Sequence, residues 1–280
     1  MREFSTIAQL RSALAEYGAA SLGFVPTMGN LHDGHLALVK AACANNELTC
    51  ASIFVNPLQF GANEDLDAYP RTLDEDRRAL SAAGCDLLFL PTADELYGAD
   101  MAASTRVHVP ALGEGFCGAS RPGHFDGVTT VVAKLFNIVQ PSSAYFGLKD
   151  FQQYAIIRKM SADLALPIEI HGLDTVRAPD GLALSSRNGY LSAEQRALAP
   201  TLYRVIKETG AALQRGEQDI EALSAHARLS LETAGLRPDY FGIAAADTLI
   251  PAAPQDRDLV ILAAVFLGKT RLIDNLRVSR

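Results

Sequence analysis

Two histidines follow a short apolar segment near the start of the chain. Residues 21–25 have the composition of a short buried strand, and a run of helix-forming residues follows the second histidine. His32 and His35 are therefore expected at a strand-to-helix junction, where Gly29 and Gly34 let the backbone come close to a bound group. The first turn of a helix offers unpaired N–H groups and a partial positive charge. The spacing predicts a phosphate-binding turn to which both imidazoles donate hydrogen bonds.

Two other interpretations of this turn remain open. A zinc site would need at least a third ligand, and the His-Glu-x-x-His pattern of metalloproteases is absent. The two histidines could also lie near a helix end without any chemical role. The choice depends on whether other loops carry groups for the same chemistry.

Composition excludes several broad classes of protein. The 280 residues carry a formal net charge of −7 with dispersed basic residues, which argues against a nucleic-acid-binding protein. The chain has no apolar signal core at its start and no apolar run approaching the ~20 residues that span a bilayer. We therefore expect a cytoplasmic protein with no membrane partner. No Cys-x-x-Cys pair occurs, so reduced packing residues are predicted at Cys43, Cys50, Cys85 and Cys117.

The first 175 residues alternate between strand-like and helix-like segments. The strand-like segments are continuously apolar, which is typical of a parallel sheet covered by helices on both faces. The predicted strands are 21–25, 49–55, 86–90, 144–146 and 167–170, and the predicted helices are 6–17, 34–45, 72–84 and 147–164. The pattern predicts an α/β fold with a Rossmann-like doubly wound parallel sheet and with ligands at the carboxyl ends of the strands.

The pattern changes near residue 175. Helical patterns at 192–215 and 217–234 are followed by strand-like segments at 240–245, 259–267 and 271–276. We predict two domains. Residues 1–175 form the Rossmann-like domain that binds the ligands, and residues 176–280 form a smaller C-terminal α+β domain that acts as a lid.

Two loops of the predicted sheet carry groups suited to a small acid. Asn56 and Gln59 follow the second strand, and their uncharged amides can bind the hydroxyls and carboxylate of a polyhydroxy acid. An ordinary turn with a solvent-facing glutamine is the alternative. Arg121 and His124 lie in a predicted loop before the apolar segment 129–139, where a turn and a helix cap are the alternative.

Two further loops carry groups suited to phosphate. Lys149 is predicted at a helix N-terminus, where a cation is unfavourable with the helix dipole unless it faces an anion. Ser185, Ser186 and Arg187 combine two hydroxyls and a guanidinium, which predicts a mobile anion-binding loop. A solvated linker before a helix capped by Ser192 is the alternative. Together the four loops favour a site for a triphosphate beside a small acid.

Six motifs, in this order and spacing, resemble those of the pantothenate synthetase family. That family is part of the superfamily of nucleotidyltransferases with a His-x-Gly-His turn, and the turn alone would imply only the superfamily. The resemblance extends from residue 23 to about residue 191 and is weak in the C-terminal third. The motifs are Pro26-Thr27-Met28-Gly29 with His32-x-Gly34-His35, Phe54-Val55-Asn56-Pro57-x-Gln59-Phe60-Gly61, Tyr69-Pro70-Arg71, Arg121-Pro122-Gly123-His124-Phe125-x-Gly127-Val128, Gly147-x-Lys149-Asp150-x-Gln152-Gln153 and Leu184-Ser185-Ser186-Arg187-Asn188.

The resemblance implies a reaction and its ligands. Members of the family use ATP to condense pantoate with β-alanine through a pantoyl-adenylate intermediate, releasing pyrophosphate and then AMP. Mg²⁺ is expected as a cofactor carried on the ATP phosphates, with no metal ligand from the protein. The expected partners are these small molecules and a second copy of the chain in a homodimer.

The resemblance also implies roles for individual residues. Charge grows on the transferred and leaving phosphates, and we assign its stabilisation to catalytic residues His35, His32, Lys149, Ser185, Ser186 and Arg187. ATP binding is implied at Met28, Gly29, Gly34, His32, His35, Gly147, Lys149, Asp150, Val176, Ser185, Ser186 and Arg187. Pantoate binding is implied at Pro26, Met28, Asn56, Gln59 and Gln153, and a contact to β-alanine or its loop at Arg121 and His124.

Some questions stay open at this point. The proton of the β-alanine amine could pass to His35, to His124 or to no dedicated base, since an acyl adenylate is already reactive. Two other functions compete with the ligase. A different nucleotidyltransferase would release pyrophosphate without AMP, and a nucleotide-binding sensor would bind ATP without turnover.

Overall fold

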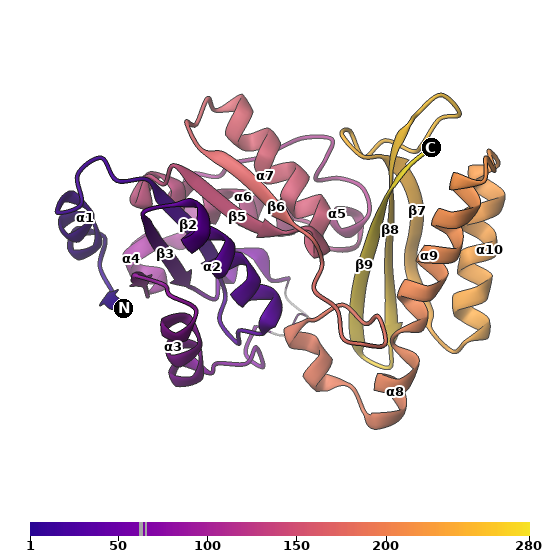
Figure 1. Ribbon diagram of the computed structural model, residues 1–280, viewed down its shortest axis with the longest axis horizontal. Coiled ribbons are helices and arrows are strands. Elements are labelled where there is room, and N and C mark those ends of the chain that lie inside the picture. The colour runs from indigo at the N-terminus through magenta and orange to yellow at the C-terminus, as the bar shows by residue number, and fades with distance from the viewer. Residues whose placement is uncertain (62–63, 65) are drawn as a thin grey trace. The chain divides into compact units, whose positions relative to one another are not determined.

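The computed structural model describes residues 1–61, 64 and 66–280, and positions 62, 63 and 65 lie outside the described residues. The chain divides by its contacts into two compact units (Figure 1). Unit 1 comprises Met1–Gly113, Arg121–Leu148 and Gln153–Asp174, and unit 2 comprises Glu114–Ser120, Lys149–Gln152 and Thr175–Arg280. Two short segments of the predicted first domain therefore belong to unit 2.

Unit 1 is built on a six-stranded parallel sheet. The strands, from one edge to the other, are β1 (Arg2–Phe4), β4 (Leu87–Phe89), β3 (Leu48–Ile53), β2 (Leu22–Thr27), β5 (Ser143–Gly147) and β6 (Glu169–Leu173). The prediction of a doubly wound parallel sheet is confirmed. The edge strand β1 was not predicted, because three residues are too few for a period to be recognised.

Helices cover both faces of this sheet. An added Cβ at Gly23 would lie 3.2 Å from the Ala42 Cβ of α2 (Asp33–Asn45). The next residue, Phe24, packs edge-on against Phe136 of α6 (His124–Val139), with 6.4 Å between ring centroids. Since successive strand residues point to opposite faces, α2 and α6 lie on opposite sides of the sheet. The other elements between the strands are α1 (Ile7–Ala15), η1 (Pro57–Gln59), α3 (Leu73–Ala82), α4 (Ala93–Tyr97), η2 (Met101–Ala103) and α7 (Phe151–Asp163).

A topological switch point lies between β2 and β5. From β2 the sheet continues through β3 and β4 on one side, whereas β5 and β6 lie on the other side. Ligands of open parallel sheets bind outside the carboxyl ends of the strands at such a point. β2 ends at Thr27, directly before Met28, and β5 ends at Gly147. The fold thus brings the start of the predicted phosphate turn and the end of β5 to one edge of the sheet.

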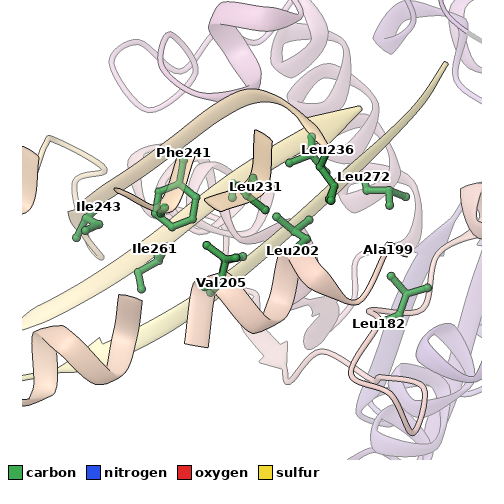
Figure 2. Close-up of a cluster of buried hydrophobic side chains, with 14 of the residues drawn as sticks. Leu182, Ala199, Leu202, Val205, Leu231, Leu236, Phe241, Ile243, Ile261 and Leu272 are labelled. Atoms are coloured by element: carbon green, nitrogen blue, oxygen red, sulfur yellow. The ribbon is translucent and has the colours of Figure 1, made fainter. Parts of the chain in front are cut away.

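Unit 2 contains a three-stranded antiparallel sheet with two helices packed on it. The strands β7 (Arg237–Ala245), β8 (Asp258–Leu267) and β9 (Thr270–Ser279) lie in this order, and α9 (Thr201–Gln214) and α10 (Ile220–Thr233) contact them. Figure 2 shows the buried side chains between the helices and the sheet, among them Leu202, Val205, Leu231, Phe241, Ile243, Ile261 and Leu272. The short elements of this unit are α5 (Cys117–Ser120), η3 (Leu148–Asp150, which begins in unit 1), η4 (Ser186–Tyr190) and α8 (Ala193–Leu198).

The single helix predicted at 192–215 is two helices in the structure. α8 ends at Leu198 and α9 begins at Thr201, with Pro200 between them. Proline has no backbone N–H and its ring clashes with the preceding turn, so the chain starts a new helix there. Among the described residues, no helix is long and apolar enough to cross a membrane.

Candidate active site

His32 and His35 close the first turn of α2 with two reciprocal hydrogen bonds. Nδ1 of His32 accepts the N–H of Gly34 at 3.1 Å, and Nδ1 of His35 accepts the N–H of His32 at 3.3 Å. A ring nitrogen that accepts a hydrogen bond carries no proton, so each neutral ring carries its proton on Nε2. The two ring centroids are 4.1 Å apart. The turn therefore presents two neighbouring Nε2–H donors.

This tautomer bears on which group could accept the proton of the β-alanine amine. A neutral ring in this state can accept a proton only at Nδ1, which already holds the turn together. His35 is therefore poorly suited to take the amine proton and well suited to donate to a phosphate oxygen.

A buried carboxylate holds the backbone ahead of the histidines. Asp76 of α3 is 2% exposed, and its two oxygens accept the N–H groups of Asn30 at 2.9 Å and Leu31 at 2.8 Å. Gly29 has φ +80°, and an added Cβ would lie 3.1 Å from an Asp76 oxygen. Sequence reasoning missed Asp76, because an acidic residue in the first turn of a helix is usual. Its burial, visible only in the fold, marks it as a positioning residue for the turn.

The residues predicted to hold the acid all belong to unit 1, and three of them contact one another. Gln59 is 8% exposed, and its Nε2 donates to the Met28 sulfur at 3.2 Å. Its Oε1 accepts from Asn56 Nδ2 at 3.0 Å. The neutral amide of Gln59 thus lies beside Met28, and the binding of pantoate by these two residues stays a prediction. Pro26 is the fifth residue of β2, and Gln153 lies half-buried in the first turn of α7.

Asn56, which the sequence predicted to bind pantoate, is hydrogen-bonded on all sides within unit 1. Its Nδ2 donates to Gln59 Oε1 and to the Gly127 carbonyl, and its Oδ1 accepts from Tyr97 Oη at 2.8 Å and from the Leu58 N–H. These four bonds use both donors and both acceptor positions of the amide. Asn56 is 1% exposed. Its amide therefore holds Gln59 Oε1 in place, and a contact of Asn56 to pantoate stays a prediction.

Gly127 allows α6 to pack directly on the backbone that carries Gln59. An added Cβ at Gly127 would lie 2.2 Å from the Leu58 carbonyl oxygen and 2.6 Å from the Gln59 nitrogen. Neither backbone atom can move without moving η1. The segment predicted as a loop before residue 129 is the start of this helix, which begins at His124 after Gly123 with φ +79°. The prediction of a loop was therefore wrong from His124 onward.

Arg121 and His124 form a network that supports the Gln59 backbone. Arg121 Nε donates to Glu64 Oε1 at 2.7 Å, and its Nη1 lies 2.9 Å from His124 Nε2. His124 Nδ1 lies 2.8 Å from the Gln59 carbonyl oxygen. A guanidinium only donates and a carbonyl only accepts, so His124 is neutral with its proton on Nδ1. Both ring nitrogens are engaged in these contacts, and the contact of Arg121 and His124 to β-alanine or its loop stays a prediction.

The remaining predicted phosphate ligands lie in unit 2. Lys149 and Asp150 belong to η3, and Lys149 Nζ lies 3.7 Å from Asp150 Oδ2. Ser185 caps η4, and its Oγ accepts the Arg187 N–H at 3.3 Å. The predicted open loop is thus a 3₁₀ turn. Val176 lies close by, since its carbonyl accepts the Leu184 N–H at 3.0 Å.

Comparison with known proteins decides the family. The family model described as pantoate-beta-alanine ligase matches residues 2–277. The chain belongs to the pantoate–β-alanine ligase family. Pantothenate synthetase of Pseudomonas putida (strain W619) is 60% identical over 280 residues, which cover 99% of this chain and 98% of that protein. Pantothenate synthetase of Pseudomonas aeruginosa (strain UCBPP-PA14) is 58% identical and covers 99% of each chain.

Solved structures of this family agree with the fold. Pantothenate synthetase from Thermus thermophilus matches with a TM-score of 0.94 and 46% identity over 100% of each chain. Pantoate–β-alanine ligase from Francisella tularensis, complexed with beta-gamma ATP and β-alanine, matches with a TM-score of 0.81 and 32% identity over 99% of this chain and 97% of that chain. The resemblance drawn from the sequence motifs is confirmed.

The described residues of the ligase chain form no evident metal centre. Among residues 1–61, 64 and 66–280, no group of three or more His, Cys, Asp and Glu side chains could hold a metal ion. A divalent cation that enters with a nucleotide would instead be held by phosphate oxygens, which are among the hard ligands that Mg²⁺ prefers.

We expect Asp76→Asn to loosen the phosphate turn. Each carboxylate oxygen accepts a backbone N–H, and an amide has only one accepting atom. The free energy of unfolding should fall by about 1–3 kcal/mol. Asp74→Asn is the control, because Asp74 is an exposed carboxylate in the same helix. Urea unfolding measures both variants, and equal stabilities would contradict the role of Asp76.

We expect Glu64→Gln to show a pH-dependent loss of stability. Burial alone would raise the pKa of Glu64, but the hydrogen bonds and charge of Arg121 lower it below its ordinary value of 4.5. A lowered folded-state pKa contributes stability above the ordinary pKa, and that stability is lost as the pH falls through the folded-state pKa. The variant should lose about 1–2 kcal/mol near neutral pH.

Urea unfolding across a pH series measures this difference. The gap between wild type and Glu64→Gln should close as the pH falls below the ordinary carboxyl value. Glu3→Gln removes an exposed partner of Arg77 and serves as the control. A gap that stays constant with pH would show that the charge of Glu64 does not stabilise unit 1.

Proposed function

We propose that this chain joins pantoate to β-alanine at the expense of ATP, through a pantoyl adenylate, and releases pyrophosphate and AMP. The observation that carries the proposal is the match of nearly the whole chain to the pantoate–β-alanine ligase family. The Francisella tularensis ligase was solved with a beta-gamma ATP and β-alanine, which supports the same two substrates here. Mg²⁺ enters in this proposal as part of Mg-ATP.

In the first step the pantoate carboxylate attacks the α-phosphorus of ATP. A phosphorus–oxygen bond forms to the carboxylate, and the bond to pyrophosphate breaks, so negative charge grows on the leaving phosphates. Preorganised donors lower this barrier because they need no reorganisation during the reaction. We assign the Nε2–H groups of His32 and His35 to this role, together with Lys149, Ser185, Ser186 and Arg187.

The acid is held by groups without charge. Gln59 offers an amide beside Met28, and Gln153 is the second amide assigned to pantoate. A cation at this position would stabilise the carboxylate and make it a weaker nucleophile. Neutral amides bind the hydroxyls and carboxylate and leave the carboxylate reactive.

In the second step the neutral amine of β-alanine attacks the acyl carbonyl and AMP leaves. Neither His35 nor His124 has a ring nitrogen suited to receive the proton, because each nitrogen that could accept it is already hydrogen-bonded. We therefore propose that positioning, rather than a histidine base, supports this step, and that the nitrogen loses its proton to the phosphate of the leaving AMP or to water. Aligned reactants reach high effective concentrations, and the acyl adenylate is already activated.

Three parts of the account stay predictions. They are a homodimer, a cytoplasmic location, and a lid function for the C-terminal part of the chain.

A reconstituted assay tests the proposed function. Purified protein is supplied with Mg-ATP and pantoate, with and without β-alanine, and chromatography resolves AMP, ADP, pyrophosphate and pantothenate. We expect AMP and pantothenate together, and only when both substrates are present. Pyrophosphate without AMP under full substrate would indicate another nucleotidyltransferase. ATP binding without turnover would indicate a sensor.

We expect His35→Ala to slow adenylate formation about a hundred- to a thousandfold, the usual cost of one preorganised donor. The measurement is pyrophosphate release in a single turnover, with circular dichroism to check the fold. His226→Ala serves as the control, because His226 is exposed on α10. A near-normal rate for His35→Ala would contradict the assignment.

We expect Gln59→Ala to weaken pantoate far more than ATP. The KM for pantoate should rise about tenfold or more, because the variant removes a hydrogen bond to the acid, whereas the KM for ATP should change little. Gln214→Ala, at the exposed end of α9, is the control. Equal changes in both KM values would show that the acid pocket is misplaced.

A further inference from the structure

In unit 2, a network of three side chains connects the segments that carry the predicted phosphate ligands of this unit. Arg177 forks onto Asp274 of β9, with Nη1 2.6 Å from Oδ2 and Nη2 2.8 Å from Oδ1. The next residue of β9, Asn275, donates from Nδ2 to the carbonyl oxygen of Lys149 at 2.8 Å. Asp274 is 4% exposed and Asn275 is 6% exposed.

The Arg177 end of the network holds a small hairpin. Arg177 pairs with Ala183 as an antiparallel bridge, and its Nη1 also donates to the Gly181 carbonyl at 3.1 Å. Its guanidinium lies 3.3 Å from the centroid of the Tyr203 ring of α9. The hairpin carries Val176 directly before Arg177 and leads into Ser185, the cap of η4. These contacts of Arg177 therefore hold the two sides of the hairpin in place relative to each other.

The Asn275 end holds the backbone of η3. The bond to the Lys149 carbonyl sets the position from which the Lys149 side chain extends. η4 also contacts β9 directly. A single strand, β9, thus contacts both the Lys149 backbone and η4, which contains Ser186 and Arg187.

We propose that Arg177, Asp274 and Asn275 are positioning residues that set the spacing between Lys149 and the Ser185–Arg187 turn for a bound triphosphate. The inference rests on the proposed function for the role of those ligands. A buried, bidentate Arg–Asp pair has a fixed geometry, which suits a spacer better than a flexible surface pair. Nothing in the reaction itself requires these three side chains to touch the substrate.

Two variants test the network at its two ends. Asn275→Asp keeps the shape of the side chain and places a carboxylate oxygen against the Lys149 carbonyl. Arg177→Lys keeps the charge and cannot fork onto Asp274. Val278→Ala is the control, because Val278 is buried on the same strand and its loss destabilises the core without touching the network.

The readout is binding of the Mg²⁺ complex of a nonhydrolysable ATP analogue by calorimetry, together with KM values for ATP and pantoate. We expect both network variants to weaken the analogue about tenfold or more and to change the KM for pantoate less than about twofold. Val278→Ala should lower the unfolding temperature and leave analogue binding close to that of the wild type. This difference between the network variants and Val278→Ala distinguishes a loss of positioning from a general loss of stability.

Analogue binding does not depend on turnover, so failures of the two proposals are distinguishable. A wild type that binds the analogue without making pantothenate contradicts the ligase but still supports the network if the variants weaken binding. Equal binding by wild type and both network variants would overturn the network. A loss that Val278→Ala reproduces, or a wild type that does not bind the analogue, would overturn it as well.

Discussion

The hydrogen bonds that the His32 and His35 rings accept from the first turn of α2 are the constraint on which the chemical account depends. In each ring, Nδ1 accepts a backbone N–H of the first helical turn, so each neutral ring carries its proton on Nε2. The same two bonds cap α2 and define the histidines as donors. The helix cap and the proposed pair of phosphate ligands therefore depend on the same two hydrogen bonds.

The residues around the proposed site mostly hydrogen-bond to backbone groups or pack against them. Asp76 accepts two N–H groups of the turn, and Gly127 lets α6 pack against the backbone of Gln59. Asn56 Nδ2 donates to Gln59 Oε1, and His124 Nδ1 lies within hydrogen-bond distance of the Gln59 carbonyl oxygen. The groups proposed to bind the acid are neutral amides, which suits a carboxylate that must stay nucleophilic.

The sequence predicted the parallel sheet and the family because both depend on local patterns. Continuous apolar strands and six spaced motifs are visible without the fold. The hydrogen bonds of Asn56 were not predicted, because its partners Tyr97 and Gly127 are distant in the sequence. Asp76 was missed for the same reason, since its burial comes from tertiary packing. The break at Pro200 was predictable in principle, because a proline inside a helical pattern ends the helix.

Nitrogen NMR of the histidine rings tests the central claim most directly. The chain has 6 histidines, and single His→Gln variants assign their signals. At neutral pH we expect His32 and His35 as neutral rings protonated on Nε2, with His124 protonated on Nδ1 in the same spectrum. His32 and His35 should keep this state when a nonhydrolysable ATP analogue binds. A proton on Nδ1 of His32 or His35, or a doubly protonated ring, would contradict their assignment as capped donors.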